Sequence, residues 1–292
     1  MPRSHLSRNV EIISDVRYVQ AESPRWDGRD GSLAWIDMAT GAFHRGRLEN
    51  GMVIPGSAVS VGRQIGAPAP LAEPGAGWVV AVDRDIVHVS DEGVVSSLAT
   101  DIAAPGHYMN DGGADPSGRF WVGSQSMPRA PHCALWSFGP DGVATERLSG
   151  VTVSNGLAFD HTGSTLYYID TLPNRSIEAF DVAADGQLSG RRTICRVDGG
   201  NPDGMTIDLE GMLWVAVWDA AEVRRYSPSG VLVQTIELPA KRPTAVALVD
   251  RLLVITTASI GLPQPGEADG ALLGVEVEIG GTPALPWGGS GR

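Results

Sequence analysis

One short pattern decides the fold of this chain, and its clearest copy is DPSGRFWVG at residues 115–123. A polar turn rich in Asp and Gly reverses the chain, and an apolar or aromatic strand follows it. Further copies occur at residues 27–37, 74–82, 160–170, 208–216 and, more weakly, 249–255. Strands introduced by such turns predict a protein that is built from repeated β units.

The repeats are evenly spaced along the chain. The first apolar residue after each turn follows the previous one by 45, 42, 46, 47 and 39 residues, for Leu33, Trp78, Phe120, Leu166, Leu213 and Leu252. Six units of about 45 residues predict an all-β, six-bladed β-propeller, with four antiparallel strands in each blade around a central channel. A single blade cannot bury both of its faces, so we expect one domain over residues 1–292, with a flexible tail after about residue 287.

The composition agrees with a folded domain of many short strands. Hydrophobic residues make up 42% of the chain and charged residues 19%, while 37 Gly and 20 Pro supply frequent turns. The net charge of −12 disfavours nucleic acid and anionic membranes as partners, because both repel an acidic surface. We expect a small-molecule substrate as the partner, and a monomer or a homodimer.

The cysteines and the N-terminal residues bear on the cellular compartment. Cys133 and Cys195 make no disulfide framework, and the polar, basic first nine residues lack the apolar core of a signal peptide. No apolar run approaches the ~18 residues that a membrane span needs. A cytoplasmic, reduced protein is therefore expected.

Four polar residues recur at nearly the same place in different repeats. Asn110, Asn155 and Asp203 each precede the Gly of their turn by 8 residues, and Glu22 precedes its Gly by 9. Such offsets place the side chains at one height around the channel, where buried carboxylates and amides are costly without a cation or ordered water. Oxygen ligands suit a divalent cation such as Ca²⁺, Mg²⁺ or Mn²⁺, and Zn²⁺ also accepts them. Taken singly, each residue could instead close a turn.

The segments around these residues resemble the SMP-30/gluconolactonase/regucalcin-like family. Four ordered motifs carry the resemblance: ESPRW at residues 22–26, NDG with DPSGRFWVG at 110–123, SNGLA with LYYID at 154–170, and PDGM with DLEGMLWVA at 202–216. The similarity runs from about Glu22 to the C-terminus.

The resemblance implies a propeller that binds one divalent cation and hydrolyses a lactone. In similar proteins the metal ligands are the residues that match Glu22, Asn155 and Asp203, and the residue that matches Asp203 is also the general base. Asn110 would contact the substrate or a metal-bound water. Ca²⁺ is the first candidate, followed by Zn²⁺, Mg²⁺, Mn²⁺ and Fe²⁺. The cation would polarise the lactone carbonyl and lower the pKa of a bound water.

Two positions depart from the family pattern near the substrate. Tyr108 stands where sugar-lactone members often carry Arg, and Pro128 stands at or near the position of a substrate-contacting Glu. Both changes remove charge and add apolar surface. We therefore expect a less hydroxylated or more hydrophobic lactone than gluconolactone. His107, which stands near Asn110, is a further candidate for the substrate pocket.

Other functions fit the same cation ligands. One is a non-catalytic, regulatory metal-binding propeller. Another is a hydrolase of phosphoesters, or a ring-opening or ring-closing enzyme that acts on a biosynthetic intermediate.

Metal ligation by histidine is not expected, because the six histidines show no HxH or HxxxH spacing. A serine hydrolase is not expected either, because GSQSM at residues 123–127 misses the GxSxG elbow. A nucleophilic Cys133 is disfavoured, because neighbouring side chains of a strand point to opposite faces and His132 would point away from it.

Overall fold

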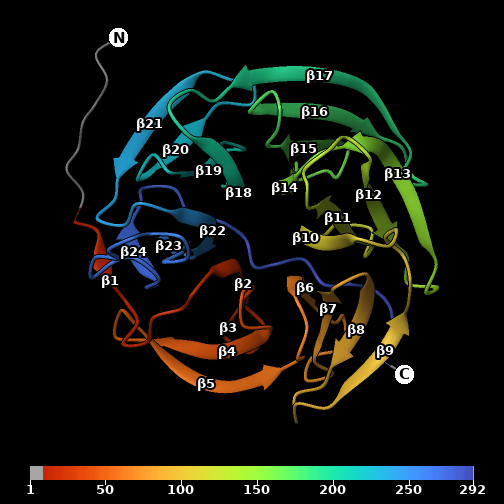
Figure 1. The fold of residues 1–292 in the computed structure, drawn as a ribbon, viewed down its shortest axis with the longest axis horizontal. Helices are drawn as coiled ribbons and strands as arrows, with labels where there is room; N and C mark the ends of the chain where they lie inside the picture. Colours follow the sequence, from red (N-terminus) through yellow and green to blue (C-terminus); the bar gives the residue numbers. More distant parts are fainter. Residues whose placement is uncertain (1–8, 292) are drawn as a thin grey trace.

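The computed structural model describes residues 9–291, and the regular elements in that range are all β-strands. Twenty-four strands form six antiparallel sheets of four strands each, arranged in a ring (Figure 1). The predicted six-bladed β-propeller is therefore confirmed.

Within residues 9–291, no helix is long and apolar enough to cross a bilayer. The basic N-terminal residues 1–8, on which the expected compartment partly rests, lie outside the described range, as does Arg292.

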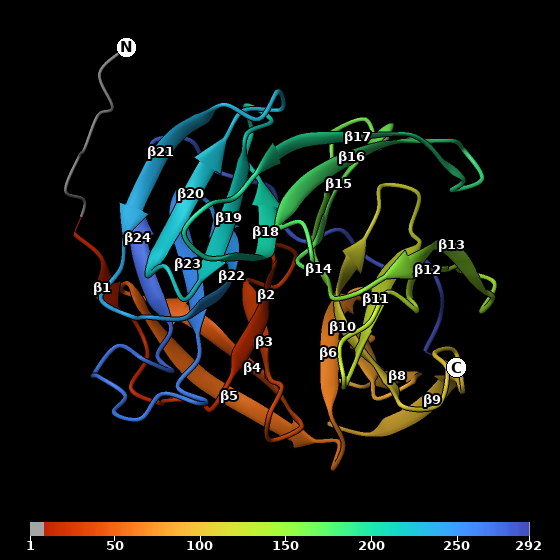
Figure 2. The same ribbon diagram turned by 45° about the horizontal axis from the view of Figure 1, so that its top comes forward.

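Five blades consist of consecutive strands, numbered from the channel outward. The first and second blades contain β2–β5 (Ala21–Asp27, Ser32–Asp37, Ala42–Glu49, Met52–Ser60) and β6–β9 (Ile65–Pro70, Trp78–Val82, Asp85–Val89, Val95–Ala99). The third and fourth contain β10–β13 (His107–Ala114, Phe120–Ser126, Cys133–Phe138, Ala144–Val151) and β14–β17 (Ser154–Phe159, Thr165–Asp170, Ser176–Val182, Leu188–Arg196). The fifth contains β18–β21 (Asn201–Ile207, Leu213–Trp218, Glu222–Tyr226, Leu232–Glu237). The tilted view places their outermost strands on the rim (Figure 2).

The sixth blade joins the two ends of the chain. Its three inner strands are β22 (Pro243–Val249), β23 (Leu252–Thr257) and β24 (Leu273–Glu276), and its outermost strand is β1 (Glu11–Ile12). β1 pairs antiparallel with β24, so that the N-terminal segment closes the ring by hydrogen bonds. The contribution of this short strand was not predicted from the sequence.

The repeated pattern is the turn between the first and second strands of a blade. In the third blade, the Asp115 carboxylate accepts two backbone N–H groups of its turn and the indole N–H of Trp121 at 2.8 Å. In the fifth blade, Asp208 accepts the same kinds of donor, with Trp214 at 3.0 Å. The Asp of the pattern therefore closes the turn and also fixes the aromatic side chain that follows it.

The core lies mainly between neighbouring blades. Trp35, Trp78, Trp121 and Trp214 are among the largest fully buried side chains, and each comes from the second strand of its blade. Phe43 of β4 meets Trp78 of the next blade with ring centroids 5.7 Å apart. Burying an aromatic side chain of this size stabilises the fold by about 1.5–3 kcal/mol. These contacts hold the ring of blades together.

The innermost strands line the channel, and each contains an irregularity where the pairing with the second strand slips. The shifts lie between Glu22 and Arg25, Ile65 and Pro68, Met109 and Gly112, Ser154 and Leu157, Pro202 and Met205, and Pro243 and Ala245. A β-bulge of this kind bends its strand and re-aims the local side chains. The six irregularities therefore control which groups enter the channel.

The C-terminal segment crosses one end of the channel (Figure 1). Its backbone N–H groups donate to carbonyls of three successive blades, from Ala284, Trp287 and Gly288 to Trp26, Pro70 and Gly118. The Trp287 ring is buried and stacks on Phe138, with centroids 5.1 Å apart. The boundaries of one domain at residues 1–292, and a flexible tail beyond Trp287, stay predictions.

Candidate metal centre

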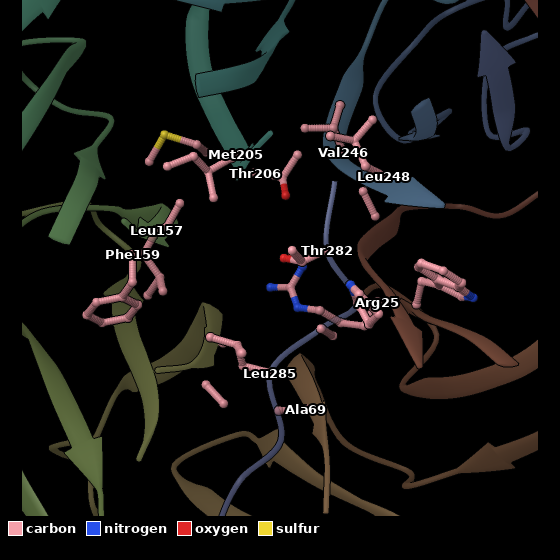
Figure 3. A pocket seen from close by; sticks show the side chains of 18 of the residues that line it. Arg25, Ala69, Leu157, Phe159, Met205, Thr206, Val246, Leu248, Thr282 and Leu285 are labelled. Carbon is pink, nitrogen blue, oxygen red and sulfur yellow. The ribbon is translucent and has the colours of Figure 1, made fainter. Parts of the chain in front are cut away.

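Two cavities lie along the central channel, one at each end of the inner strands. The larger, of about 280 Å³, lies under the C-terminal segment, and apolar side chains make up most of its labelled wall, with Arg25 pointing into it (Figure 3). The smaller, of about 100 Å³, has a mostly polar wall that includes two carboxylates and several amides. Because the smaller cavity brings together ionisable side chains and oxygen atoms that could hold a cation, it is the candidate site despite its size.

The smaller cavity contains all four residues of the predicted ring. Glu22, Asn110, Asn155 and Asp203 line it, and each is only 5–7% exposed. The two Asn residues and Asp203 lie within the bulges of β10, β14 and β18. Glu22 is the last paired residue before the bulge of β2, and Ser23 follows it with a left-handed φ of 47°. All four bulges contain two unpaired residues, and Glu22 stands one position before its pair, which accounts for its larger offset.

The two carboxylates resist ionisation together. Burial, followed by the charge of Asp111, raises the pKa of Glu22 to about 8. Burial also raises the pKa of Asp203 well above its ordinary value; Glu22 and Asp111 add to this, and Arg129 opposes it. Two negative charges in this cavity need a compensating positive charge. The carboxylates therefore fit a divalent cation, which would stabilise both of them in the ionised form.

A chain of hydrogen bonds fixes the direction of the Asn155 amide. The Thr171 hydroxyl donates to the Pro202 carbonyl at 2.8 Å, so its oxygen accepts from Nδ2 of Asn155 at 2.7 Å. The Asn155 Oδ1 atom consequently faces the other way and accepts from Nδ2 of Asn110 at 3.0 Å. The Pro202 carbonyl can only accept, so the Thr171 hydroxyl must donate to it. The Asn155 amide therefore cannot flip without losing its hydrogen bonds to Thr171 and Asn110. Asn155 therefore presents an oxygen, the atom that a hard cation requires.

The same cavity contains polar atoms that lack a partner. Asn110 donates to the Ser154 carbonyl at 2.6 Å and accepts from Nε2 of Gln125 at 2.7 Å. Among the described residues, Oε1 of Gln125 and Oδ1 of Asn201 are buried without a hydrogen-bond partner, and both side chains line the cavity. Orphaned buried acceptors indicate a place for water, an ion or a ligand. The oxygen atoms that line the cavity, taken together, fit a cation that prefers oxygen ligands.

Asp111 and Arg129 were not given a role by the sequence analysis. Oδ1 of Asp111 accepts from the Ser23 hydroxyl at 3.0 Å and pairs with the Arg25 guanidinium at 3.3 Å. This ion pair lies between the two cavities, since Arg25 reaches into the larger one. Arg129 is exposed and lines the smaller cavity. The available signal for Asp111 was its place directly after Asn110 in a conspicuous Asn-Asp-Gly run.

The other predicted substrate contacts lie elsewhere. Neither His107 nor Tyr108 is among the residues of the described chain that line the smaller cavity. Tyr108 is half-buried beside Gln64, and burial raises the pKa of its hydroxyl. Pro128 lies in the exposed loop after β11, next to Arg129. Roles of His107 and Tyr108 in substrate binding stay predictions, with less geometric support than that of Asn110.

His107 instead meets His132 and Cys133. The two imidazole rings stack with centroids 4.7 Å apart, and one ligand atom from each of the three side chains lies within 4.8 Å of the others. The expectation that His132 points away from Cys133 is therefore wrong, because His132 lies in the turn before β12 and is outside the strand alternation. Sequence spacing missed this histidine pair, because pairing of β10 with β11 brings the two rings together.

Known proteins resemble the whole propeller. Residues 20–259 match a family model described as the SMP-30/Gluconolactonase/LRE-like region. Regucalcin from Danio rerio is 33% identical over 267 residues, which cover 88% of each chain. The 6-deoxy-6-sulfogluconolactonase of Pseudomonas putida is 34% identical over 235 residues, which cover 78% of this chain and 79% of that protein. The structure of a luciferin-regenerating enzyme matches with a TM-score of 0.88 at 25% identity, covering 96% of this chain and 99% of that one. The chain therefore belongs to the SMP-30/gluconolactonase/LRE-like family.

Proposed function

We propose that the protein is a metal-dependent hydrolase of the EC 3.1.1 class that opens a lactone in the smaller cavity. One observation carries the proposal: two mutually repelling, buried carboxylates, Glu22 and Asp203, share this cavity with the oriented oxygen of Asn155. Relatives named as lactonases, among them the Pseudomonas putida protein, support hydrolysis of a lactone. A cytoplasmic location and a monomeric or homodimeric state stay predictions.

Glu22, Asn155 and Asp203 are the proposed ligands of one divalent cation. All three offer oxygen, which makes Ca²⁺ the first candidate and leaves Zn²⁺, Mg²⁺, Mn²⁺ and Fe²⁺ as alternatives. When bound, the cation supplies a positive charge that polarises the lactone carbonyl. The chain's own contribution is to hold the three oxygen atoms in place.

Asp203 is the proposed general base. Its carboxylate takes a proton from the water that attacks the carbonyl carbon of the lactone. The ring C–O bond then breaks, and the ring oxygen receives a proton, which gives a hydroxy acid. Burial raises the pKa of Asp203 in the chain alone, and the cation would hold this carboxylate in the ionised form that can accept a proton. Asn110, which is held by Gln125 and Asn155, is the proposed contact to the substrate.

The proposed substrate is a lactone with fewer hydroxyl groups than gluconolactone. Tyr108 and Pro128 stand where sugar-lactone members of the family carry charged residues, as the resemblance implies. The unpaired acceptors of Gln125 and Asn201 leave room for one or two hydroxyl donors. Arg129 adds a positive charge to the cavity wall, which favours an acidic substituent. The relative named 6-deoxy-6-sulfogluconolactonase gives a reason to include sulfonated lactones among the candidates.

A second candidate function is a regulatory, non-catalytic metal-binding protein. The relatives named regucalcin favour it, because their names state no hydrolytic activity. Both candidates require the cation, and only the first requires Asp203 to act as a base. Turnover therefore separates them.

The test is a pH-indicator screen of metal-stripped protein with each divalent ion in turn. Sugar, sulfonated, aliphatic and aromatic lactones serve as substrates, with phosphoesters beside them. We expect cation-dependent turnover of at least one lactone, and a loss of about 100-fold or more in kcat for Asp203→Asn. The exposed Asp219→Asn is the matched control and should keep full activity.

Each other outcome has a definite meaning. Undiminished turnover by stripped protein or by Asp203→Asn would overturn the mechanism. Cation binding without turnover of any ester would support the regulatory function, and activity on phosphoesters alone would redefine the substrate. A high kcat/KM for gluconolactone would contradict the proposed substrate preference.

A further inference from the structure

We propose that His107, His132 and Cys133 form a second metal site, which takes a borderline or soft transition-metal ion such as Zn²⁺ or Co²⁺. His107 begins β10, Cys133 begins β12, and His132 precedes it in the turn after β11. Two imidazoles and a thiolate are a ligand set that zinc proteins use. The residues are brought together by the sheet of the third blade and are 26 positions apart at most.

The three side chains lie in a part of the molecule that is separate from the candidate metal centre. The two histidines line an open hollow of about 530 Å³, whose wall also includes Arg84, Trp136 and Glu146. Its lining includes none of Glu22, Asn155 and Asp203. Cys133 is buried behind the two histidines, so an ion held by the three side chains would face the hollow and keep a fourth position for water or an exchangeable ligand.

Only a small rearrangement is needed to bind an ion. The three ligand atoms lie within 4.8 Å of one another, whereas tetrahedral coordination by zinc places such atoms about 3.5 Å apart. The backbones of His107 and Cys133 are held in strands. The exposed His132 ring is stacked on His107 at 19° and contacts the Ser126 hydroxyl through Nε2 at 3.1 Å. Rotation of the exposed His132 ring, together with small side-chain rotations of His107 and Cys133, would bring the three atoms to bonding distance.

The protonation of His107 also suits a metal. Burial, together with the neighbouring His132, lowers the pKa of His107, so its ring is neutral at pH 7. Two stacked imidazoles that were both protonated would repel each other. A histidine must be neutral to bind a metal ion. His107 therefore has no extra proton to lose when an ion binds.

The two sites should select different ions. The candidate metal centre offers only oxygen, which hard ions such as Ca²⁺ prefer, while nitrogen and sulfur favour Zn²⁺ and Co²⁺. An excess of Ca²⁺ should therefore leave the proposed second site available. This proposal does not depend on lactone hydrolysis, because it concerns other residues and another readout.

The experiment is a titration of reduced protein with Co²⁺ in the presence of excess Ca²⁺, followed by ultraviolet absorption. A thiolate bound to Co²⁺ gives a charge-transfer band, which oxygen ligands do not give. We expect a band that saturates at about one equivalent and is lost in Cys133→Ser. His132→Ala should weaken the binding by about 10-fold or more.

Two controls separate this site from others. Cys195→Ser changes the chain's second cysteine, on β17, and should keep the band with unchanged affinity, as should Asp203→Asn. A wild-type protein without the band, or a folded Cys133→Ser protein that retains it, overturns the proposal. If Cys133→Ser does not fold, His132→Ala decides, because its side chain is exposed: unchanged Co²⁺ affinity in that variant overturns the proposal as well.

Discussion

The inner strands of the six blades share one irregularity but use it in two ways. In blades one, three, four and five the irregular segment carries or adjoins Glu22, Asn110, Asn155 and Asp203, which line the candidate metal centre. In blades two and six the corresponding segments carry Gly66 and Thr244. The backbone repeats around the whole ring, whereas the polar lining is confined to four blades.

Gly66 and Thr244 support the blades beside them. A Cβ atom on Gly66 would lie 2.6 Å from the backbone oxygen of Asn110, so the absence of a side chain lets β6 approach β10. The Thr244 hydroxyl donates to the backbone oxygen of Ala21, next to Glu22, at 2.6 Å. The two blades without a predicted ligand therefore hold in place two strands that carry residues of the candidate metal centre.

The difference teaches that symmetry of the backbone does not imply symmetry of the chemistry. A bulge only turns a residue towards the channel or a neighbouring blade, and the residue type then decides between binding and support. If this division is right, the blades with polar residues should control cation binding directly. The supporting blades should control it through the position of a neighbouring strand.

The largest expected effect is that of cation removal, and it should grow with pH. Without a cation, the pKa of Glu22 is raised from 4.5 to about 8 in the folded chain, and that of Asp203 is raised too. The folded state then binds more protons than the unfolded state, so stability is lost as pH rises from about 4.5 towards 8. A cation at about 100 times its Kd adds about 2.7 kcal/mol. At about 2–4 °C per kcal/mol, Tm should rise by about 5–10 °C.

Thermal unfolding of stripped and cation-loaded protein at pH 5 and pH 8 measures this effect. We expect a larger cation-induced rise in Tm at pH 8, where protons compete less with the cation for the two carboxylates than at pH 5. The double variant Glu22→Gln with Asp203→Asn should lose both the cation effect and its growth with pH. Equal pH dependence of Tm with and without cation in the wild-type protein would contradict the assignment of these carboxylates.

A smaller effect is expected from Gly66→Ala in the second blade. The added methyl group would press on the backbone of Asn110, and overpacking of this kind costs about 1–3 kcal/mol. We expect a lower Tm and a weaker cation affinity, because Asn110 donates to the proposed ligand Asn155. Isothermal calorimetry and thermal unfolding measure the two quantities.

Gly113→Ala is the matched control, since this glycine lies on β10 itself. Its added methyl group would meet Arg25 at 3.6 Å, an ordinary contact. The control should keep both Tm and cation affinity close to those of the wild type. If the two variants behave alike, close approach of β6 to β10 is not what supports the site.

Much of this arrangement could be predicted from sequence because it repeats. The Asp-to-Gly turns gave the number of blades, and their equal offsets placed Asn110, Asn155 and Asp203 at one height. Glu22 fitted less well, because it is the last paired residue before its bulge, whereas Asn110, Asn155 and Asp203 are unpaired residues within theirs. A ligand that stands one position away from the repeated place leaves no periodic signal.

The features that the sequence did not reveal depend on contacts between distant segments. β1 completes the sixth blade by pairing with β24, which only ring closure brings near. His107 and His132 meet because β10 pairs with β11, and the Asp111–Arg25 ion pair joins two blades. Pattern and spacing describe one strand at a time, so they cannot report such pairs.

The smallest expected effect is that of Thr244→Val in the sixth blade. Valine keeps the shape of threonine but removes the hydroxyl, so the Ala21 carbonyl loses its hydrogen bond at a cost of about 1–3 kcal/mol. Tm should therefore fall by a few degrees. Cation affinity should change by less than in Gly66→Ala, because the Glu22 side chain itself remains in place. Thr235→Val on the outer strand β21 is the control for the loss of a hydroxyl. Cation binding that weakens more in Thr244→Val than in Gly66→Ala would show that the sixth blade takes a direct part in the metal centre.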